Sequence, residues 1–340
     1  MKGDRRPHPV GRRRGSGRVR VSPGYRSKTP SVKMSRMYDE VVTVVENRPL
    51  TGGHFLLSVH SPRQARATRP GQFAMVRLPG GLDTLLRRPM SIYDLKAAVA
   101  RTSVGGAKSR VAGHRPALQR QRAPEIIQLL YKIVGKGTRQ MAGLRPGDRL
   151  EMLAPLGHGF FPEDYLAEAR ADDEVLHVAG GIGIAALLLA ARELAGQGIP
   201  QRLFFGGRTK EDLVGVEDFK PYVRATVLAT EDGSRGHCGF VTQPLEEYLL
   251  RNRNKKFLFM VCGPWLMLEA TVKLAQKYRH RCLVSMENRM GCAIGVCLGC
   301  SIRVQGTGHG AYERVCTEGP VFWAEKVVWG KERMSRVRGI

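Results

Sequence analysis

Long apolar runs and acidic residues are both scarce in this 340-residue sequence. Its most apolar stretch, residues 182–191, is too short to span a bilayer, and no apolar segment follows the basic N-terminus. We therefore expect neither a membrane helix nor a signal peptide. No internal repeat is visible either. The 42% of hydrophobic residues and the 40 glycines instead suit a globular, loop-rich chain of two to three domains.

Cysteine is also sparse, with seven residues in the chain. Four of them gather near the C-terminal end, and three are scattered: Cys238, Cys262 and Cys282. An odd number of scattered cysteines is a poor disulfide framework. We therefore expect reduced thiols and a cytoplasmic protein.

Acidic residues number only 30 against 55 Lys and Arg, which gives a net charge of +25. Two segments, residues 1–36 and 96–122, account for 18 of these excess charges. Neither shows hydrophobic periodicity, so we expect a basic disordered tail and a basic insertion. An arm that binds nucleic acid is the less favoured interpretation. Another is that translation starts at Met34 or Met37.

The pattern between residues 37 and 165 is that of β-strands. Runs at 41–45, 55–59, 73–78 and 126–134 are β-branched or alternating, and Pro-Gly turns separate them. Several short strands with turns between them predict a small antiparallel barrel. The insertion 96–122 would interrupt a hairpin between Ile92 and Ile127.

Strands alternate with helices between residues 166 and 280, which predicts a doubly wound parallel α/β domain. We expect strands at 175–179, 202–205, 225–229 and 257–261, and helices at 185–195, 241–250 and 264–278. Residues 281–340 would form a third, small unit.

The third unit carries the most specific motif. Its cysteines have the spacing C-x4-C-x2-C, and a fourth follows at a distance: Cys292, Cys297, Cys300 and Cys316. This is the ligand spacing of a plant-type [2Fe–2S] cluster. Zinc also accepts four thiolates, but zinc ribbons pair two C-x2-C knuckles and only one such pair occurs here. Gly291, Gly295 and Gly299 would allow positive φ angles and close backbone approach in this loop.

Two glycine motifs follow predicted strands of the α/β domain. Gly180, Gly181 and Gly183 stand where a strand meets a helix, and Cys262-Gly263 follows another strand. Ligands bind at this edge of open α/β sheets, and glycines let backbone N–H groups approach a pyrophosphate. The alternatives are an ordinary structural turn and, for Cys262, a small core residue.

The barrel contains two further candidate phosphate sites. Arg87 and Arg88 stand beside Pro89 and a serine, where paired guanidiniums could hold a diphosphate and the hydroxyl could reach a flavin. A solvated basic turn is the alternative. Residues 135–138, Gly-Lys-Gly-Thr, resemble a phosphate-approach turn that opens a short helix.

Together these motifs resemble the ferredoxin-reductase superfamily, and more narrowly the electron transfer subunits of class B dihydroorotate dehydrogenase. The resemblance covers residues 37–325 without 96–122. Beyond the motifs above, it rests on Pro-Gly-Gln-Phe at 70–73, Glu-Asn-Arg-Met at 287–290 and Gly-Pro-Val-Phe at 319–322. Where the superfamily has an aromatic residue in R-x-Y-S, this chain has Met90, as the narrower family does.

The resemblance implies an FAD-binding barrel, an NAD-binding α/β domain and a C-terminal [2Fe–2S] unit bound by the four cysteines. Electrons would pass from the FMN of a separate catalytic subunit through the cluster and FAD to NAD+, in pyrimidine synthesis. No residue is assigned as a catalytic acid or base. Two alternatives stay open: a related sulfhydrogenase- or transhydrogenase-type subunit, and a metal-bearing nucleic-acid module. The residues implied to line FAD are Arg88, Pro89, Met90, Ser91, Leu130, Tyr131, Lys132, Gly137 and Thr138.

Overall fold

The computed structural model describes residues 36–78, 86–97, 123–160, 174–306 and 311–330. They belong to one compact unit, Ser35–Ile340. Almost all of the predicted basic tail and insertion lies outside the described residues. Within these ranges, no helix is both long enough and apolar enough to cross a membrane.

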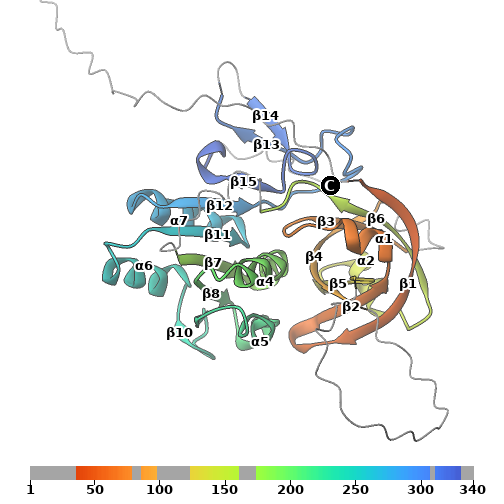
Figure 1. Ribbon diagram of the computed structural model, residues 1–340, viewed down its shortest axis with the longest axis horizontal. Helices are drawn as coiled ribbons and strands as arrows, with labels where there is room; N and C mark the ends of the chain where they lie inside the picture. The colour runs from red at the N-terminus through yellow and green to blue at the C-terminus, as the bar shows by residue number, and fades with distance from the viewer. Residues whose placement is uncertain (1–35, 79–85, 98–122, 161–173, 307–310, 331–340) are drawn as a thin grey trace, which may run out of the picture. The chain divides into compact units, whose positions relative to one another are not determined.

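Six antiparallel strands form a closed barrel in the order β1-β2-β5-β4-β3-β6 (Figure 1). This confirms the predicted small barrel. Side chains alternate along β5, and Ile127, Leu129 and Tyr131 all point into the barrel core. The barrel elements are β1 (Tyr38–Pro49), η1 (Thr51–Gly53), β2 (His54–His60), α1 (Pro62–Ala67), β3 (Phe73–Arg77), β4 (Arg88–Lys96), β5 (Ile126–Lys132), α2 (Lys136–Ala142) and β6 (Arg149–Leu156).

The predicted hairpin around the insertion is present. Strands β4 and β5 pair antiparallel, with Leu95 opposite Ile127 and Lys96 opposite Ile126. The backbone N–H of Glu125 also donates to the carbonyl of Lys96 (2.9 Å). Lys96, which the prediction placed in the insertion, therefore belongs to strand β4.

A seven-stranded sheet has the order β10-β9-β8-β7-β11-β12-β15. All neighbours are parallel except β15, which runs antiparallel to β12. The strands β12 and β15 come from residues 281–340, so this segment also completes the sheet. The strands are β7 (Glu174–Gly180), β8 (Gln201–Gly207), β9 (Ala225–Thr230), β10 (His237–Cys238), β11 (Phe257–Cys262), β12 (Arg281–Ser285) and β15 (Val321–Trp323).

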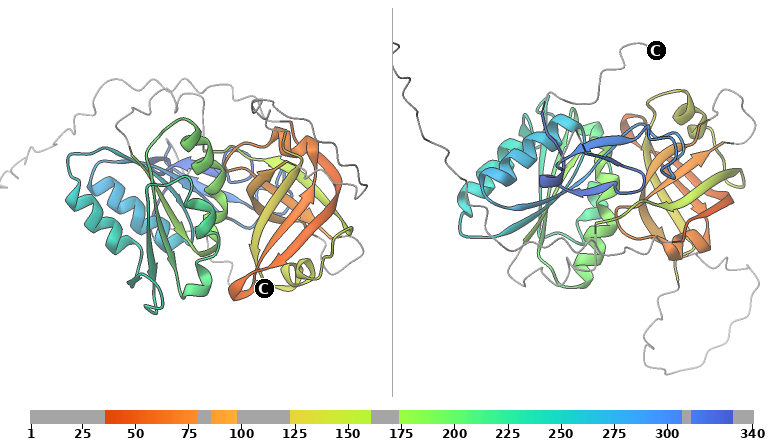
Figure 2. Two further views of the ribbon diagram at one scale, coloured as in Figure 1. Left: turned by 60° about the horizontal axis from the view of Figure 1, so that its bottom comes forward. Right: turned by 90° about the horizontal axis from the view of Figure 1, so that it is seen from above.

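Helices cover both faces of this sheet, as the predicted doubly wound topology requires (Figures 1 and 2). One apolar core lies under α4 and α5, and a second lies under α6 and α7. The first glycine loop forms a 3-10 turn before α4, so the α-helix begins three residues later than predicted. The helical elements are η3 (Gly181–Ala186), α4 (Leu188–Gly196), η4 (Lys210–Asp212), α5 (Val216–Phe219), α6 (Thr242–Arg251) and α7 (Trp265–Lys277).

The barrel and the sheet are packed together. The core under α4 and α5 includes Tyr93 and Leu130 of the barrel. The Tyr93 hydroxyl donates to Asp218, and Arg192 pairs with Asp94. The small C-terminal unit adds the hairpin of β13 (Ser301–Val304) and β14 (Ala311–Arg314), with η5 (Ala324–Lys326) after β15.

Candidate functional site

The two phosphate motifs of the barrel meet in space. A methyl group placed on Gly137 would lie 2.2 Å from Nε of Arg88 and 2.7 Å from its Cζ. The guanidinium of Arg88 therefore rests on the backbone of α2, and its Nη1 donates to the carbonyl of Leu86 (2.5 Å). An arginine next to a glycine-rich turn is a suitable arrangement for a diphosphate.

Thr138 fixes the turn that leads into α2. Its hydroxyl oxygen accepts the backbone N–H groups of Val134 (2.9 Å) and Gly135 (3.1 Å). The hydroxyl also donates to the carbonyl of Gly135 (3.1 Å). The side chain of Thr138 thus shapes the turn, and the open space beside Gly135 lies next to it.

Arg87 does not share the site of Arg88. Its guanidinium binds both carboxylate oxygens of Asp39 (2.8 and 2.9 Å) and also Glu151 (3.0 Å). The expectation of paired guanidiniums at a diphosphate therefore fails, because Arg87 is committed to acids of β1 and β6. Only Arg88 stays next to the glycine turn.

The remaining barrel residues divide by strand alternation. Leu130 and Lys132 point toward the α/β domain, where Lys132 forms an ion pair with Asp212. Tyr131 lies between them and points into the barrel, where its hydroxyl donates to Asn47 (3.2 Å). Burial raises the pKa of Tyr131 to about 12.

Strand β4 shows the same division. Met90 packs against the barrel core, whereas Pro89 is exposed and Ser91 is half-buried. Met90 and Tyr131 therefore point toward the barrel core, whereas Pro89 and Ser91 lie on the other face of β4.

The glycine motifs of the α/β domain also meet. Strand β7 connects to β8 on one side, whereas β11 lies on its other side, so the topological switch point lies between β7 and β11. A methyl group on Gly183 would lie 2.4 Å from the carbonyl oxygen of Cys262. A methyl group on Gly180 would collide with Met267, and Gly263 has a φ of 159°. Crevices at such switch points bind nucleotides.

Two members of this group differ in what they offer a ligand. Gly181 has a φ of 51° and open space where a side chain would be. Cys262 is 1% exposed, and burial raises the pKa of its thiol. The side chain of Cys262 therefore belongs to the core. At this end of the strand, only backbone groups beside Cys262 are left to contact a ligand.

The four C-terminal cysteines form two pairs. The backbone N–H of Cys297 donates to Sγ of Cys292 (3.3 Å), and that of Cys316 donates to Sγ of Cys300 (3.4 Å). In the described ranges, which contain all four, no three metal-ligating side chains gather around one point. Two irons of a [2Fe–2S] cluster take two thiolates each, which these two pairs could supply. The pairing therefore favours an iron–sulfur cluster.

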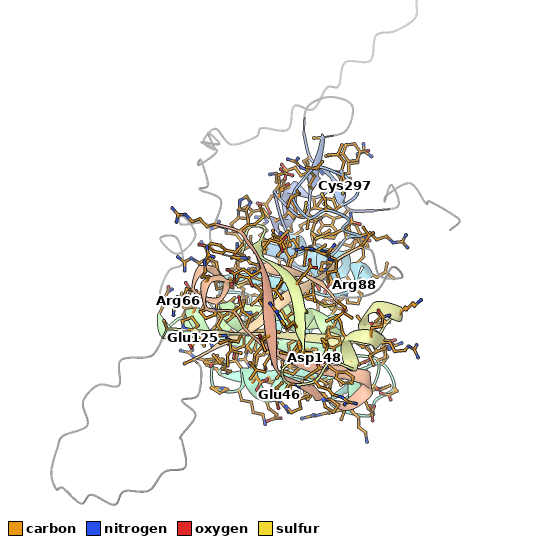
Figure 3. All side chains as sticks on the ribbon, turned by 90° about the vertical axis from the view of Figure 1, so that its right-hand side faces the viewer. Glu46, Arg66, Arg88, Glu125, Asp148 and Cys297 are labelled. Carbon is orange, nitrogen blue, oxygen red and sulfur yellow. The ribbon has the colours of Figure 1, made fainter. Side chains whose placement is uncertain are left out.

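The two pairs differ in environment. Cys300 and Cys316 are 1% and 2% exposed, whereas Cys297 is exposed at the periphery of its unit (Figure 3). Burial alone would raise the pKa of Cys292, but N–H groups of the loop lower it to about 7. Burial, with the hydrogen bond to Cys300, raises the pKa of Cys316 to about 12.

The glycines of the ligand loop act differently from the prediction. Only Gly295 has a positive φ, of 83°, and the other left-handed residues are Ala293 and Leu298. A methyl group on Gly291 or Gly299 would lie 3.4 or 3.6 Å from Sγ of Cys297. These two glycines therefore keep the sulfur of Cys297 uncovered.

Sequence reasoning missed Asp212 and the ion pair between Arg314 and Glu318. Arg314 contacts the ligand loop by donating to the carbonyl of Gly295 (2.9 Å). Burial alone would raise the pKa of Glu318, but hydrogen bonds from Arg314 lower it to about 2. The only available signal was that both residues stand two positions from Cys316.

Two family models match this chain. Residues 287–328 match the iron–sulfur cluster binding domain of dihydroorotate dehydrogenase B, and residues 177–273 match the oxidoreductase NAD-binding domain. The first match contains all four paired cysteines. The second contains both glycine motifs at the switch point.

Curated relatives match over most of their length. The dihydroorotate dehydrogenase B (NAD(+)) electron transfer subunit of Desulforamulus reducens is 33% identical, over 87% of this chain and all of that protein. The subunit of the same name from Geobacillus thermodenitrificans is 33% identical, over 85% of this chain and 98% of that one.

Solved structures share the architecture. One reported for an NADH-dependent reduced ferredoxin-NADP oxidoreductase is 27% identical, with a TM-score of 0.67, over 85% of this chain and 90% of that one. A ferredoxin reductase of carbazole 1,9a-dioxygenase, at 20% identity and a TM-score of 0.53, covers 72% of this chain and 67% of that one. The second likeness concerns the fold alone.

Proposed function

The chain belongs to the family of dihydroorotate dehydrogenase B electron transfer subunits, and we propose that it passes electrons from a catalytic partner subunit to NAD+. The observation that carries this proposal is the pairing of the four cysteines within the iron–sulfur domain. Cys292 and Cys297 would hold one iron, and Cys300 and Cys316 the other. The protein is thus an oxidoreductase subunit with a [2Fe–2S] cluster, FAD and NAD as cofactors.

The barrel residues fit FAD at the diphosphate. Arg88 supplies a charged donor beside Gly137, and Thr138 holds the glycine turn in shape. Pro89, Ser91, Leu130 and Lys132 face the α/β domain or solvent, on the side where a flavin ring would lie. We also keep Met90 and Tyr131 in the proposed set, as residues that support this wall from the barrel core.

NAD(H) is proposed to bind at the switch point of the sheet. Gly180 and Gly183 allow close packing of the loop against Cys262 and Gly263, and Gly181 leaves space open for the pyrophosphate. FAD, when bound, connects the two electrons that NAD exchanges as a hydride with the single electrons that the cluster carries. No side chain is assigned as an acid or base.

The partner is proposed to be an FMN-containing catalytic subunit that docks over the ligand loop. Three apolar side chains near Cys297 in the ligand loop are exposed: Ile294, Val296 and Leu298, at 46%, 74% and 62%. Transfer of single electrons between subunits needs close approach of the redox centres, so this loop would be buried on association. Apolar groups exposed together in this way are typical of protein contacts.

The setting is proposed to be the cytoplasm, where the scattered Cys238, Cys262 and Cys282 would stay free thiols. Pyrimidine synthesis is the proposed process. We also propose the domain boundaries 1–36, 37–165, 166–280 and 281–340, with strands β12 and β15 of the last segment joined to the sheet.

The test is reconstitution with a class B catalytic subunit. Alone, the loaded chain should oxidise NADH with artificial one-electron acceptors and leave dihydroorotate unchanged. The mixture should form orotate with NAD+. Dihydroorotate turnover by the isolated chain would contradict the proposal, as would failure to couple the catalytic subunit to NAD+ with both cofactors loaded. Coupling to ferredoxin and NADP instead would favour a transhydrogenase-type function.

A further inference from the structure

The four cysteines come from two separate segments, and Arg314 joins them. Its Nη1 donates to the carbonyl of Gly295, between Cys292 and Cys297 in the ligand loop (2.9 Å). Its Nε donates to Glu318, beyond Cys316 (3.0 Å). Loop and turn are packed closely here, since a methyl group on Gly295 would lie 3.0 Å from Nη1.

The same residue organises the turn that contains Cys316. The carbonyl of Arg314 accepts the N–H groups of Thr317, Glu318 and Gly319 (3.2, 3.0 and 3.2 Å). The backbone N–H of Arg314 donates to the carboxylate of Glu318 (2.7 Å), and Nη2 binds its other oxygen. Arg314 and Glu318 therefore close a ring of hydrogen bonds around one iron ligand.

This ring also contacts the barrel. The backbone N–H of His158 donates to the carbonyl of Gly319 (2.6 Å), and its Nδ1 lies 3.3 Å from the carbonyl oxygen of Glu318. The turn is thus fixed on both sides, by the ligand loop and by the end of β6. A change of charge at Arg314 or Glu318 is expected to leave the backbone contacts to the barrel in place.

A cluster held by four thiolates is an anion that gains a further negative charge when it is reduced. A nearby cation favours the reduced form, and a nearby carboxylate opposes it. The guanidinium of Arg314 interacts electrostatically with Cys300 and Cys316, and the carboxylate of Glu318 is its counter-charge.

We propose that Arg314 is a positioning residue that joins the two ligand segments and raises the reduction potential of the cluster, with Glu318 as its opposing charge. This inference rests on the proposed function, because it requires the cluster. It makes this ion pair one determinant of the driving force for electron transfer between the cluster and the flavin.

The test compares neutral variants of each partner in the full-length chain after anaerobic reconstitution with iron and sulfide. Potentials are read by redox titration of the EPR signal of the reduced cluster. Arg314→Gln should lower the potential and Glu318→Gln should raise it. Arg314→Lys keeps the positive charge, so its reduction potential should lie nearer to that of the wild type than the potential of Arg314→Gln does. Lys326→Gln is the matched control, because it also removes one cation from an ion pair, here with the neighbouring Glu313 (2.6 Å).

Opposite shifts support the proposal, with the control unchanged. Shifts of the potential with the same sign in Arg314→Gln and Glu318→Gln, or no shift in either variant, would overturn it. A pair with a purely structural role predicts that loss of either partner disturbs the cluster in the same way. If Arg314→Gln fails to assemble a cluster, the comparison of Arg314→Lys with Glu318→Gln decides, and only a raised potential in Glu318→Gln supports the inference. A wild-type chain that takes up no cluster contradicts the proposed function instead.

Discussion

Replacing Gly137 by Ala should weaken FAD binding without weakening the fold. The new methyl group would lie 2.2 Å from Nε of Arg88, well inside contact distance, so the guanidinium must move off the glycine turn. Gly137 lies inside α2 with no positive φ, and alanine there favours the helix by roughly 0.5–1 kcal/mol. Thermal stability of the apoprotein should therefore stay equal or rise.

The expected loss follows from the hydrogen bonds of Arg88. A bond from a charged donor contributes about 1.5–3 kcal/mol, which corresponds to roughly a ten- to hundredfold increase in the Kd for FAD. Arg88→Ala should give this loss directly, and Gly137→Ala should approach it. Titration of the apoprotein with FAD, followed by flavin fluorescence, measures both. Iron content should not change.

A double-mutant cycle separates this mechanism from general damage. In the Arg88→Ala background, Gly137→Ala should cost little further affinity, because the group that it displaces is already gone. Gly143→Ala is the control, since its methyl group would stand at an ordinary 3.4 Å from Gln140 at the other end of α2. Additive losses in the double variant, or an equal loss in the control, would refute the reasoning.

Three further outcomes are expected. Cys297→Ser should abolish or severely disturb the cluster, while Cys238→Ser, at another exposed cysteine, should leave iron content unchanged; the reverse pattern would show the ligand set to be wrong. Deleting residues 1–36 and shortening 96–122 should leave NADH oxidation intact, and salt-dependent binding of nucleic acid that the deletion removes would contradict this. Burial lowers the pKa of His177 from 6.5 to about 4, so the folded state excludes a proton that the unfolded state binds. The resulting contribution to the free energy of unfolding, about 3 kcal/mol, should be present above pH 6.5 and be lost as the pH falls toward 4. His177→Gln should flatten this pH dependence of the free energy of unfolding, as measured by urea titrations.

The sequence predicted those parts of the site that depend on neighbours along the chain. The spacing of Cys292, Cys297 and Cys300 has few other uses, and the strand-glycine motif at Gly180 follows from a local rule. The barrel and the doubly wound sheet followed from the same kind of local pattern, because strand and helix periodicities differ.

What sequence reasoning missed depends on contacts between distant residues. Arg87 stands next to Arg88, yet its partners Asp39 and Glu151 belong to other strands. Tyr131 stands inside a predicted motif, but strand alternation turns it into the barrel. The ligand loop likewise places Ala293 in a left-handed conformation, where a glycine was the expected residue.

The arrangement of the cysteines suggests how the small C-terminal unit connects the proposed catalytic subunit with the proposed flavin site. Cys300 and Cys316 share an apolar core with Phe73 of the barrel. Phe73 is the pairing neighbour of Ser91 on β4, in the strand that begins with Arg88. The buried sulfur pair therefore belongs to the same apolar core as the barrel strand next to the proposed flavin site, whereas Cys297 is exposed. Since single electrons pass between centres only at close approach, we expect electrons to enter at the exposed Cys297 and to leave at the buried Cys300 and Cys316.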